Sequence, residues 1–156
     1  MQLTQAADYA VRAMIHLAGL PQATRVTLPD LASAIGSPAQ FLSKVLQQMV
    51  KARLVVSQRG GGGGFQLAVD PEQVSLFQVV EAIEGPTALN RCLIAGHSCN
   101  RQSWCAAHFA WMEAQEALVR VLQSASIARL ARESATRREI IEIQAAQKQQ
   151  ENDPLS

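Results

Sequence analysis

The stretch TLPDLASAIGSPAQFLSKVLQQMVKARL, residues 27–54, decides the fold because it contains two helix starts separated by a single turn. Thr27 with Asp30 forms a capping-box-like pair, and Gly36 ends the short helix that they begin. After the turn, a longer helix is expected to run to about Ala52. Its apolar side chains are expected to face the core: Phe41, Leu42, Val45, Leu46, Met49 and Val50.

The opposite face of this longer helix is polar, with Gln40, Ser43, Lys44 and Gln47. A short helix, a turn and a longer helix with a polar outer face are typical of a helix-turn-helix, whose second helix enters the DNA major groove. Glutamine can contact adenine, and lysine can contact guanine or phosphate. The alternative is an ordinary solvated helix face, and the hairpin that follows favours DNA.

Two short strands are expected next, at residues 54–58 and 65–69, separated by Arg59 and five consecutive glycines. We interpret this hairpin as the wing of a winged helix, with a flexible linker as the alternative. The glycine loop, beginning at Gly60, can lie close to a sugar-phosphate backbone while Arg59 enters a narrow minor groove. Lys51 and Arg53 are predicted to contact phosphates. A phosphate-binding P-loop is excluded because no Gly-Lys-Ser/Thr follows the glycines.

Outward from this unit, capping residues predict a first helix at residues 4–19 and another from Ser75 to Gly85. A long helix is expected at residues 105–124, and a short one at 126–130 that packs back on it. The fold is therefore predicted to be mainly α with a small β-hairpin. We divide the chain into four parts. Residues 1–85 form a DNA-binding domain and residues 86–104 a cluster-binding loop. Residues 105–132 form a dimerisation helix region, and residues 133–156 a polar tail that is either helical or disordered.

Charge is unevenly distributed along the 156 residues, although the net charge is only +1. Residues 1–69 carry six Lys/Arg and two Asp, whereas residues 70–156 carry eight Lys/Arg and eleven Asp/Glu. The first half is therefore the part expected to meet phosphate. The apolar runs are short and the chain does not open with a signal-peptide pattern, so we expect a cytoplasmic protein with reduced thiols and no membrane partner.

The only three cysteines lie close together in the pattern C-x6-C-x5-C-x2-H, formed by Cys92, Cys99, Cys105 and His108. This spacing is too open for the C-x2-C pairs of common zinc sites, and an odd number of thiols cannot all form disulfides within one chain. Three thiolates with one further ligand suit an iron-sulfur cluster. His108 lies one helical turn after Cys105, on the same face of the predicted helix.

Four segments resemble a known family, the winged-helix iron-sulfur transcription regulators that include IscR, NsrR and RirA. These are MQLT with DYAVRA near the start, VSQRG with GGF in the wing, SL with VVEAIEG in residues 75–85, and the cysteine trio. The resemblance covers about residues 1–130. It implies a homodimer that binds a pseudo-palindromic operator, and whose affinity is controlled by a cluster that senses iron or iron-sulfur status, nitric oxide or redox stress.

The fourth ligand is left open between two residues. His108 matches the histidine ligand of IscR-like members and would complete a 2Fe-2S cluster, which we favour. Asp8 matches the acidic residue that, in NsrR-like members, reaches a 4Fe-4S cluster from the partner subunit. His97, between two cysteines, is the third choice.

Three other functions compete with this hypothesis. An enzyme with Cys105 as nucleophile and His108 as base fits poorly, because the chain offers no evident orienting acid or oxyanion loop, so we expect no enzymatic activity. A small iron-sulfur electron carrier fits poorly as well, because it needs no recognition helix or wing. A cluster-free repressor of the same fold, controlled by thiol oxidation or stabilised by zinc, is the remaining alternative.

Overall fold

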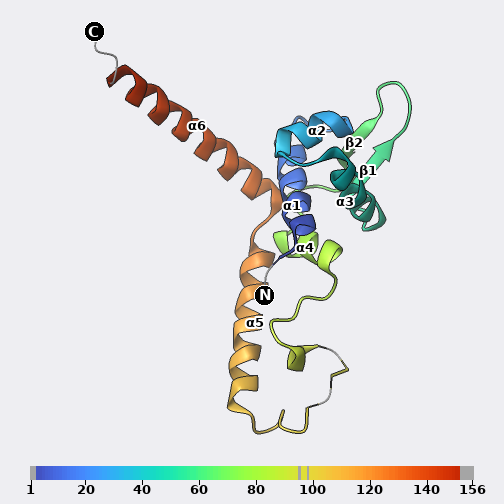
Figure 1. The fold of residues 1–156 in the computed structure, drawn as a ribbon, viewed down its shortest axis with the longest axis vertical. Coiled ribbons are helices and arrows are strands. Elements are labelled where there is room, and N and C mark those ends of the chain that lie inside the picture. Colours follow the sequence, from blue (N-terminus) through green and yellow to red (C-terminus); the bar gives the residue numbers. More distant parts are fainter. Residues whose placement is uncertain (1–2, 95, 98, 152–156) are drawn as a thin grey trace.

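Three helices form the centre of the molecule in the computed structural model, which describes residues 3–94, 96–97 and 99–151. They are α1 (Gln5–Ala18), α2 (Leu28–Ile35) and α3 (Ala39–Lys51). Met14 of α1, Leu31 of α2 and Leu46 of α3 are each fully buried in one shared core. The predicted helix-turn-helix is confirmed, and Figure 1 shows α2 and α3 packed beside α1.

The predicted caps explain where these helices begin and end. The Thr27 hydroxyl accepts a hydrogen bond from the Asp30 N–H, and Gly36 adopts the left-handed conformation with φ 68°. One predicted core residue is wrong: Phe41 is 37% exposed and packs edge-on against Tyr9. The reason is helical geometry, since Phe41 lies two turns before the exposed Gln48 and shares its face.

The wing consists of the antiparallel strands β1 (Val55–Gln58) and β2 (Gly64–Leu67). The hairpin is confirmed, with each strand slightly shorter than predicted. The sequence did not predict that Val26 would extend this sheet. Val26 and Phe65 exchange two backbone hydrogen bonds, of 3.0 and 2.8 Å, so the segment before α2 lies along the outer edge of β2.

Helix α4 (Leu76–Glu84) packs against α1 and α3. Its predicted capping box is complete: Ser75 and Gln78 each accept a backbone N–H of the other. The start of α1 is tied to the end of α4, because the Glu84 carboxylate accepts hydrogen bonds from both the backbone N–H and the hydroxyl of Thr4. This arrangement fixes where the loop after α4 begins.

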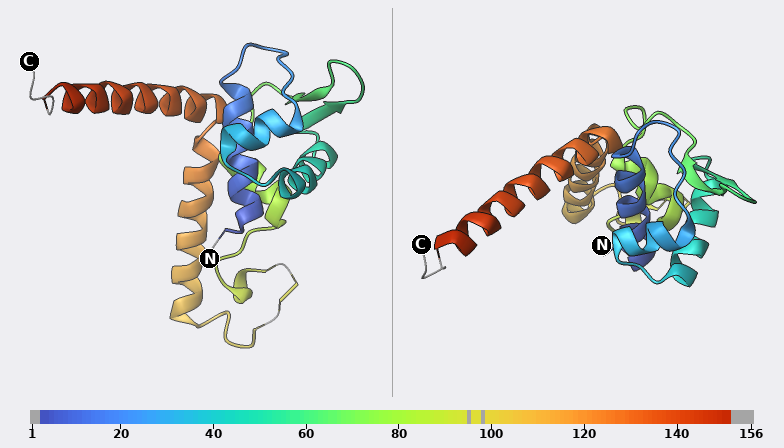
Figure 2. Two further views of the ribbon diagram at one scale, coloured as in Figure 1. Left: turned by 45° about the horizontal axis from the view of Figure 1, so that its top comes forward. Right: turned by 90° about the horizontal axis from the view of Figure 1, so that it is seen from above.

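The loop contains the short 3₁₀ helix η1 (Arg91–Leu93) and leads into α5 (Ala106–Ser124), which packs against α4 and η1. The predicted α5 is confirmed. The short final helix is wrong in length and position: α6 (Ile127–Glu151) is one helix that packs on α1, because Ile127 is completely buried in the core. Figures 1 and 2 show the rest of α6 leading away from the other helices.

The residues left open as a helical or disordered tail are therefore helical from Glu133 to Glu151, and the rest of the tail lies outside the described residues. No helix in the described part of the chain combines the length and apolarity needed to cross a membrane.

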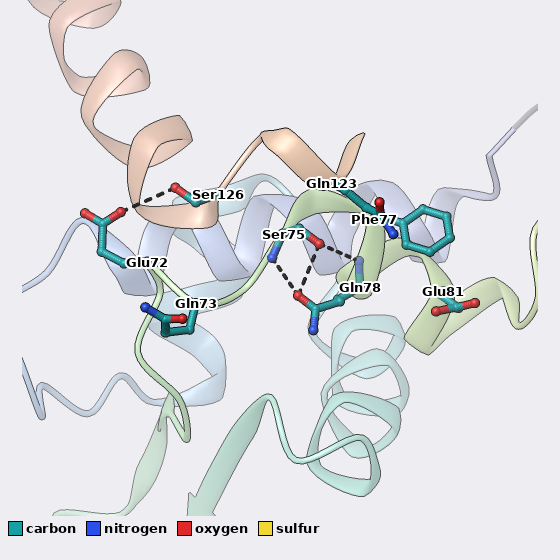
Figure 3. A pocket seen from close by; sticks show the side chains of 8 residues that line it. All are labelled: Glu72, Gln73, Ser75, Phe77, Gln78, Glu81, Gln123 and Ser126. Carbon is teal, nitrogen blue, oxygen red and sulfur yellow. Dashed lines mark hydrogen bonds between the residues drawn. The ribbon is translucent and has the colours of Figure 1, made fainter. Parts of the chain in front are cut away.

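The bend between α5 and α6 is held by the segment that follows the wing. Leu76 N–H donates to the carbonyl of Ala125, Ile127 N–H to that of Val74, and Ala128 N–H to that of Pro71. Figure 3 shows Ser126 beside Glu72 on this bend, next to a pocket of about 410 Å³. The chain that leaves β2 is thus hydrogen-bonded, at residues 71–76, to the α5–α6 bend.

Candidate functional site

The predicted groove-facing surface lies on the outer side of α3. Gln40, Lys44 and Gln47 are exposed and Ser43 is half-buried, while Leu42, Val45, Leu46 and Met49 on the other side are buried. The core contacts hold α3 against α1 and α2, so its polar side chains project from a fixed support. Such a surface can donate and accept hydrogen bonds at the edges of base pairs.

Lys51 and Arg53, the predicted phosphate contacts, are exposed at the end of α3. Arg53 has a φ of 60°, which is the left-handed conformation that normally favours glycine. The N–H of Arg53 donates to Val50 and that of Leu54 donates to Met49, which together close the end of the helix. Arginine thus occupies a position where its side chain carries a conformational cost.

Arg59 and Gly60 are exposed at the tip of the wing, where Gly60 has a φ of 98°. The strict need for glycine lies further along the loop. A side chain on Gly63 would collide with the backbone of Gln58 and Gly60, and one on Gly64 would stand 2.6 Å from the Val26 carbonyl oxygen. Gly61 has open space around it. The tight wing is therefore set by its last two glycines.

One basic residue of this surface was missed by sequence reasoning. Arg25 is exposed beside the wing, and its Nε donates to the Gln66 side-chain oxygen on β2 at 3.1 Å. The backbone bridge between Val26 and Phe65 brings these side chains together. The β-branched residues Val26 and Thr27 after Arg25 were the available signal for an extra strand, but a single bridge is too short to give a periodic pattern.

The three cysteines come from three different local structures. Cys92 lies in η1, Cys99 lies in the following loop, and Cys105 occupies the N-cap position of α5 without a side-chain capping hydrogen bond. All three are free thiols and half-buried. The described residues contain no group of three or more His, Cys, Asp or Glu side chains placed to hold a metal ion, so the ligand set remains a prediction.

His108 differs from the other candidate ligands because it is buried. It is 6% exposed, and its Nδ1 is one of two buried side-chain polar atoms in the described residues that have no hydrogen-bond partner. Phe109 packs edge-on against the imidazole at 5.8 Å between ring centroids. A buried polar atom without a partner costs free energy, so this nitrogen suits a ligand role. The chemistry of three thiols and one unpaired imidazole nitrogen fits an iron-sulfur cluster.

The alternative fourth ligands lie on the surface. Asp8, in the first turn of α1, forms an ion pair of 2.9 Å with Arg12, and both side chains are about half exposed. His97 is exposed in the loop between Cys92 and Cys99. Neither residue lies one helical turn from Cys105, as His108 does, and Asp8 is predicted to serve a cluster in the other subunit.

Comparisons with known proteins identify the family of the chain. A family model, Rrf2, described as an iron-dependent transcriptional regulator, matches residues 3–133. The transcriptional regulator NsrR of Geobacillus kaustophilus is 32% identical over 142 residues, which cover 90% of this chain and 97% of that protein. IscR of Vibrio vulnificus is 29% identical over 143 residues, covering 92% of this chain and 82% of that protein.

Solved structures show the same fold. The IscR structure of T. potens has a TM-score of 0.69 and 22% identity, covering 86% of this chain and 88% of the other. CymR, the global cysteine regulator of B. subtilis, has a TM-score of 0.69 and 21% identity, covering 84% of this chain and 96% of the other. With its helix-turn-helix, wing and long α5, the chain belongs to the Rrf2 family of DNA-binding transcriptional regulators.

Proposed function

We propose that this regulator acts as a homodimer on a pseudo-palindromic operator, and that an iron-sulfur cluster held by Cys92, Cys99, Cys105 and His108 controls its operator affinity. The buried Nδ1 of His108, which has no partner in the described structure and lies one turn after Cys105, is the observation that carries the proposal. The DNA-binding role follows from membership of the family. The cluster is proposed because three thiols and one imidazole are suitable cluster ligands.

Each DNA-facing residue has a separate role in this proposal. Gln40, Ser43, Lys44 and Gln47 present donors and acceptors to the major groove. Arg59 enters the minor groove at the wing, where Gly60 permits a close backbone approach. Lys51 and Arg53 contact phosphates and fix the register of α3 on the duplex without reading bases.

The ligand residues would hold the cluster between η1 and the first turn of α5. A cluster would supply a redox-active, air-sensitive group whose assembly depends on iron supply and which reacts with nitric oxide. Cys105 and His108 both lie at the start of α5, so ligation by these two residues would fix the position of this end of the helix. With His108 as fourth ligand we favour a 2Fe-2S cluster; with Asp8 of a second subunit the cluster would be 4Fe-4S.

Apolar side chains on α5 support the dimer. Phe109, Trp111, Met112 and Val121 are between 40% and 62% exposed, so the chain itself leaves them uncovered. Large exposed apolar surfaces of this kind mark interaction sites. Phe109 and Met112, three positions apart, share one face of α5. A second copy packed on that face would cover them and place two α3 helices on one operator, because a twofold dimer presents the same surface twice.

The same helix could connect cluster and DNA. α5 begins at the ligand residues Cys105 and His108 and ends at the bend that is hydrogen-bonded to residues 71–76, which follow the wing. A change in the position of α5 would therefore reach the wing and the dimer contact together. Operator affinity is expected to differ between the cluster-loaded and cluster-free protein for this reason.

The test compares oxygen-free wild type with His108→Ala and Asp8→Ala. Visible spectra with iron and sulfide analysis report the cluster type and the fourth ligand, and operator titrations at one salt concentration report the switch. We expect a coloured wild type, loss or alteration of the cluster in His108→Ala, and different affinities with and without cluster.

The competing function is a cluster-free repressor controlled by its thiols or stabilised by zinc. It is favoured by the three half-buried free cysteines, which are accessible to oxidants. Colourless protein that contains zinc, or whose operator affinity responds only to thiol oxidation, would replace the cluster proposal with this one. Equal operator affinity of loaded and cluster-free protein would refute the switch.

A further inference from the structure

The side-chain amide of Gln115 is bonded to the backbone segment that leads into the cysteine loop. Its Nε2 donates to the carbonyl oxygen of Thr87, and its Oε1 accepts from the N–H of Leu89, both at 2.9 Å. These are the two bonds that a residue of a parallel β-strand would make to such a segment. The amide cannot be reversed without placing like dipoles together, so its orientation is determined by its partners.

Gln115 lies on the same face of α5 as His108. The two residues are seven positions apart, which is two helical turns or about 10 Å along the helix axis. Thr87, Leu89 and Gln115 are all half-buried, and α5 packs here against α4 and η1. The amide therefore bonds the start of the loop to the helix that carries two of the candidate ligands.

The two unpartnered buried side-chain atoms of the described residues both belong to this region. They are Thr87 Oγ1, in the segment bonded by Gln115, and His108 Nδ1, two turns before Gln115. Buried polar groups normally find hydrogen-bond partners. Because these two atoms lack one, the position of residues 87–89 on α5 depends strongly on the hydrogen bonds that are present. Among the described residues, Gln115 makes two long-range side-chain hydrogen bonds between α5 and residues 87–89.

We propose that Gln115 is a positioning residue that fixes the Cys92 end of the loop against α5. Cys92 follows Leu89 by three residues, so a fixed Leu89 restricts where the thiol can lie relative to Cys105 and His108. The inference rests on the proposed function for the use of Cys92, but the positioning itself is a property of the cluster-free chain. It assigns Gln115 a role that acts through Cys92 and requires no contact with a cluster.

The first experiment uses cluster-free protein and the variants Gln115→Ala and Gln115→Glu. Gln123, an exposed glutamine near the end of the same helix, provides the matched controls Gln123→Ala and Gln123→Glu. We measure hydrogen exchange of the Leu89 amide and the alkylation rate of Cys92 by mass spectrometry. For each hydrogen bond that a Gln115 variant loses, we expect the Leu89 exchange rate and the Cys92 alkylation rate to rise about fivefold. The two Gln123 variants should show wild-type rates.

The Gln115→Glu variant supplies a signature that general destabilisation would not produce. When protonated, the introduced carboxyl group can still donate to the Thr87 carbonyl and accept from Leu89, whereas the ionised group places negative charge against that carbonyl. Gln115→Glu should therefore approach the wild-type Leu89 protection at acid pH. As the carboxyl group ionises, it should lose part of this protection, because the bond to Thr87 is lost while the bond from the Leu89 N–H remains; both values are corrected for intrinsic exchange. Gln123→Glu should show no such dependence.

The second experiment follows the loaded protein in air, where Gln115→Ala should lose its cluster several times faster than wild type or Gln123→Ala. Equal Cys92 alkylation in Gln115→Ala and Gln123→Ala would overturn the positioning role, even with an intact cluster in wild type. Faster Cys92 alkylation with unchanged cluster loss would also overturn its role at the cluster. A wild type that never holds a cluster would instead overturn the proposed function, and the cluster-free measurements would still decide whether Gln115 positions Cys92.

Discussion

At the scale of single residues, backbone conformation separates positions that serve the fold from those that serve function. Two non-glycine residues have positive φ, Ala23 at 64° and Arg53 at 60°, within the part of the chain that the structure describes. Ala23 lies in the loop between α1 and α2, and Arg53 closes α3 on the proposed DNA surface. A strained residue at such a surface points to a function for its side chain.

Arg53→Gly is expected to stabilise the protein while weakening operator binding. Removing the left-handed strain should raise the free energy of unfolding by up to about 1 kcal/mol. Loss of a phosphate contact should reduce the slope of log affinity against log salt by about one. Thermal unfolding and anisotropy titrations in a salt series measure both, with Ala23→Gly as the control that gains stability only. An unchanged salt slope would remove Arg53 from the DNA contacts.

The glycines of the wing are expected to respond differently to alanine. Gly61→Ala should leave stability unchanged or raise it by about 0.5 kcal/mol, because the new methyl group meets open space and the unfolded chain loses freedom. Gly63→Ala should destabilise the wing, since its Cβ would collide with the backbone of Gln58 and Gly60. Chemical denaturation and operator titration of the two variants test this, and equal behaviour would contradict the loop geometry.

At the scale of elements, α6 is held to the rest of the molecule by its first turns. Ile127 is fully buried and belongs to the core, whereas Ile140 on the same helix is 48% exposed. Ile127→Ala should therefore reduce the free energy of unfolding by about 2–4 kcal/mol, and Ile140→Ala by less than about 0.5 kcal/mol. Urea denaturation compares them. Similar losses in both would show that α6 is covered along its whole length.

The bend between α5 and α6 should make stability depend on acid pH. A hydrogen bond from Arg132, with a Coulombic contribution from the same guanidinium, lowers the pKa of Glu72 below its ordinary value of 4.5. Because the folded-state pKa is depressed, the stabilisation is present above about pH 4.5 and is lost as pH falls through the lowered pKa. Glu72→Gln should flatten this acid part of the stability curve.

The control for Glu72→Gln is Glu142→Gln, an exposed position of α6 beyond the bend. Both Glu72 and Arg132 are also exposed, so the effect on stability is small and is best seen as a difference between the two pH profiles. Superimposable profiles for the two variants below pH 4.5 would show that the Glu72–Arg132 pair contributes nothing to the bend.

At the scale of the whole molecule, the family match ends at residue 133, while α6 continues to Glu151. A chain ending at Glu133 keeps Ile127, Ala128 and Ala131, the buried residues among the α6 side chains that the structure describes. Its free energy of unfolding and operator affinity should therefore equal those of the full chain within about 0.5 kcal/mol. Calorimetry and operator titration test this, with a chain ending at Ser124 as the destabilised control. A loss of affinity would reveal a role for the exposed Ile140, Ile141 and Ile143.

The sequence by itself determined the helices up to α5, the wing hairpin and the residue types of the site, but not the length and packing of α6. Capping residues and apolar periodicity are local signals, so Thr27, Gly36 and the Ser75–Gln78 pair correctly predicted where helices begin and end. The motifs also identified the family, and the polar face of α3 is exposed as the pattern predicted.

Only the tertiary structure decided which side chains meet across long stretches of chain. The Arg25–Gln66 contact, the packing of α6 on α1 and the Gln115 bonds to residues 87 and 89 each join segments that are far apart in sequence. Local pattern cannot predict them, because each depends on how loops and helices pack around one core. The burial of His108 is of the same kind: the sequence supplied the imidazole, and packing left its Nδ1 without a partner.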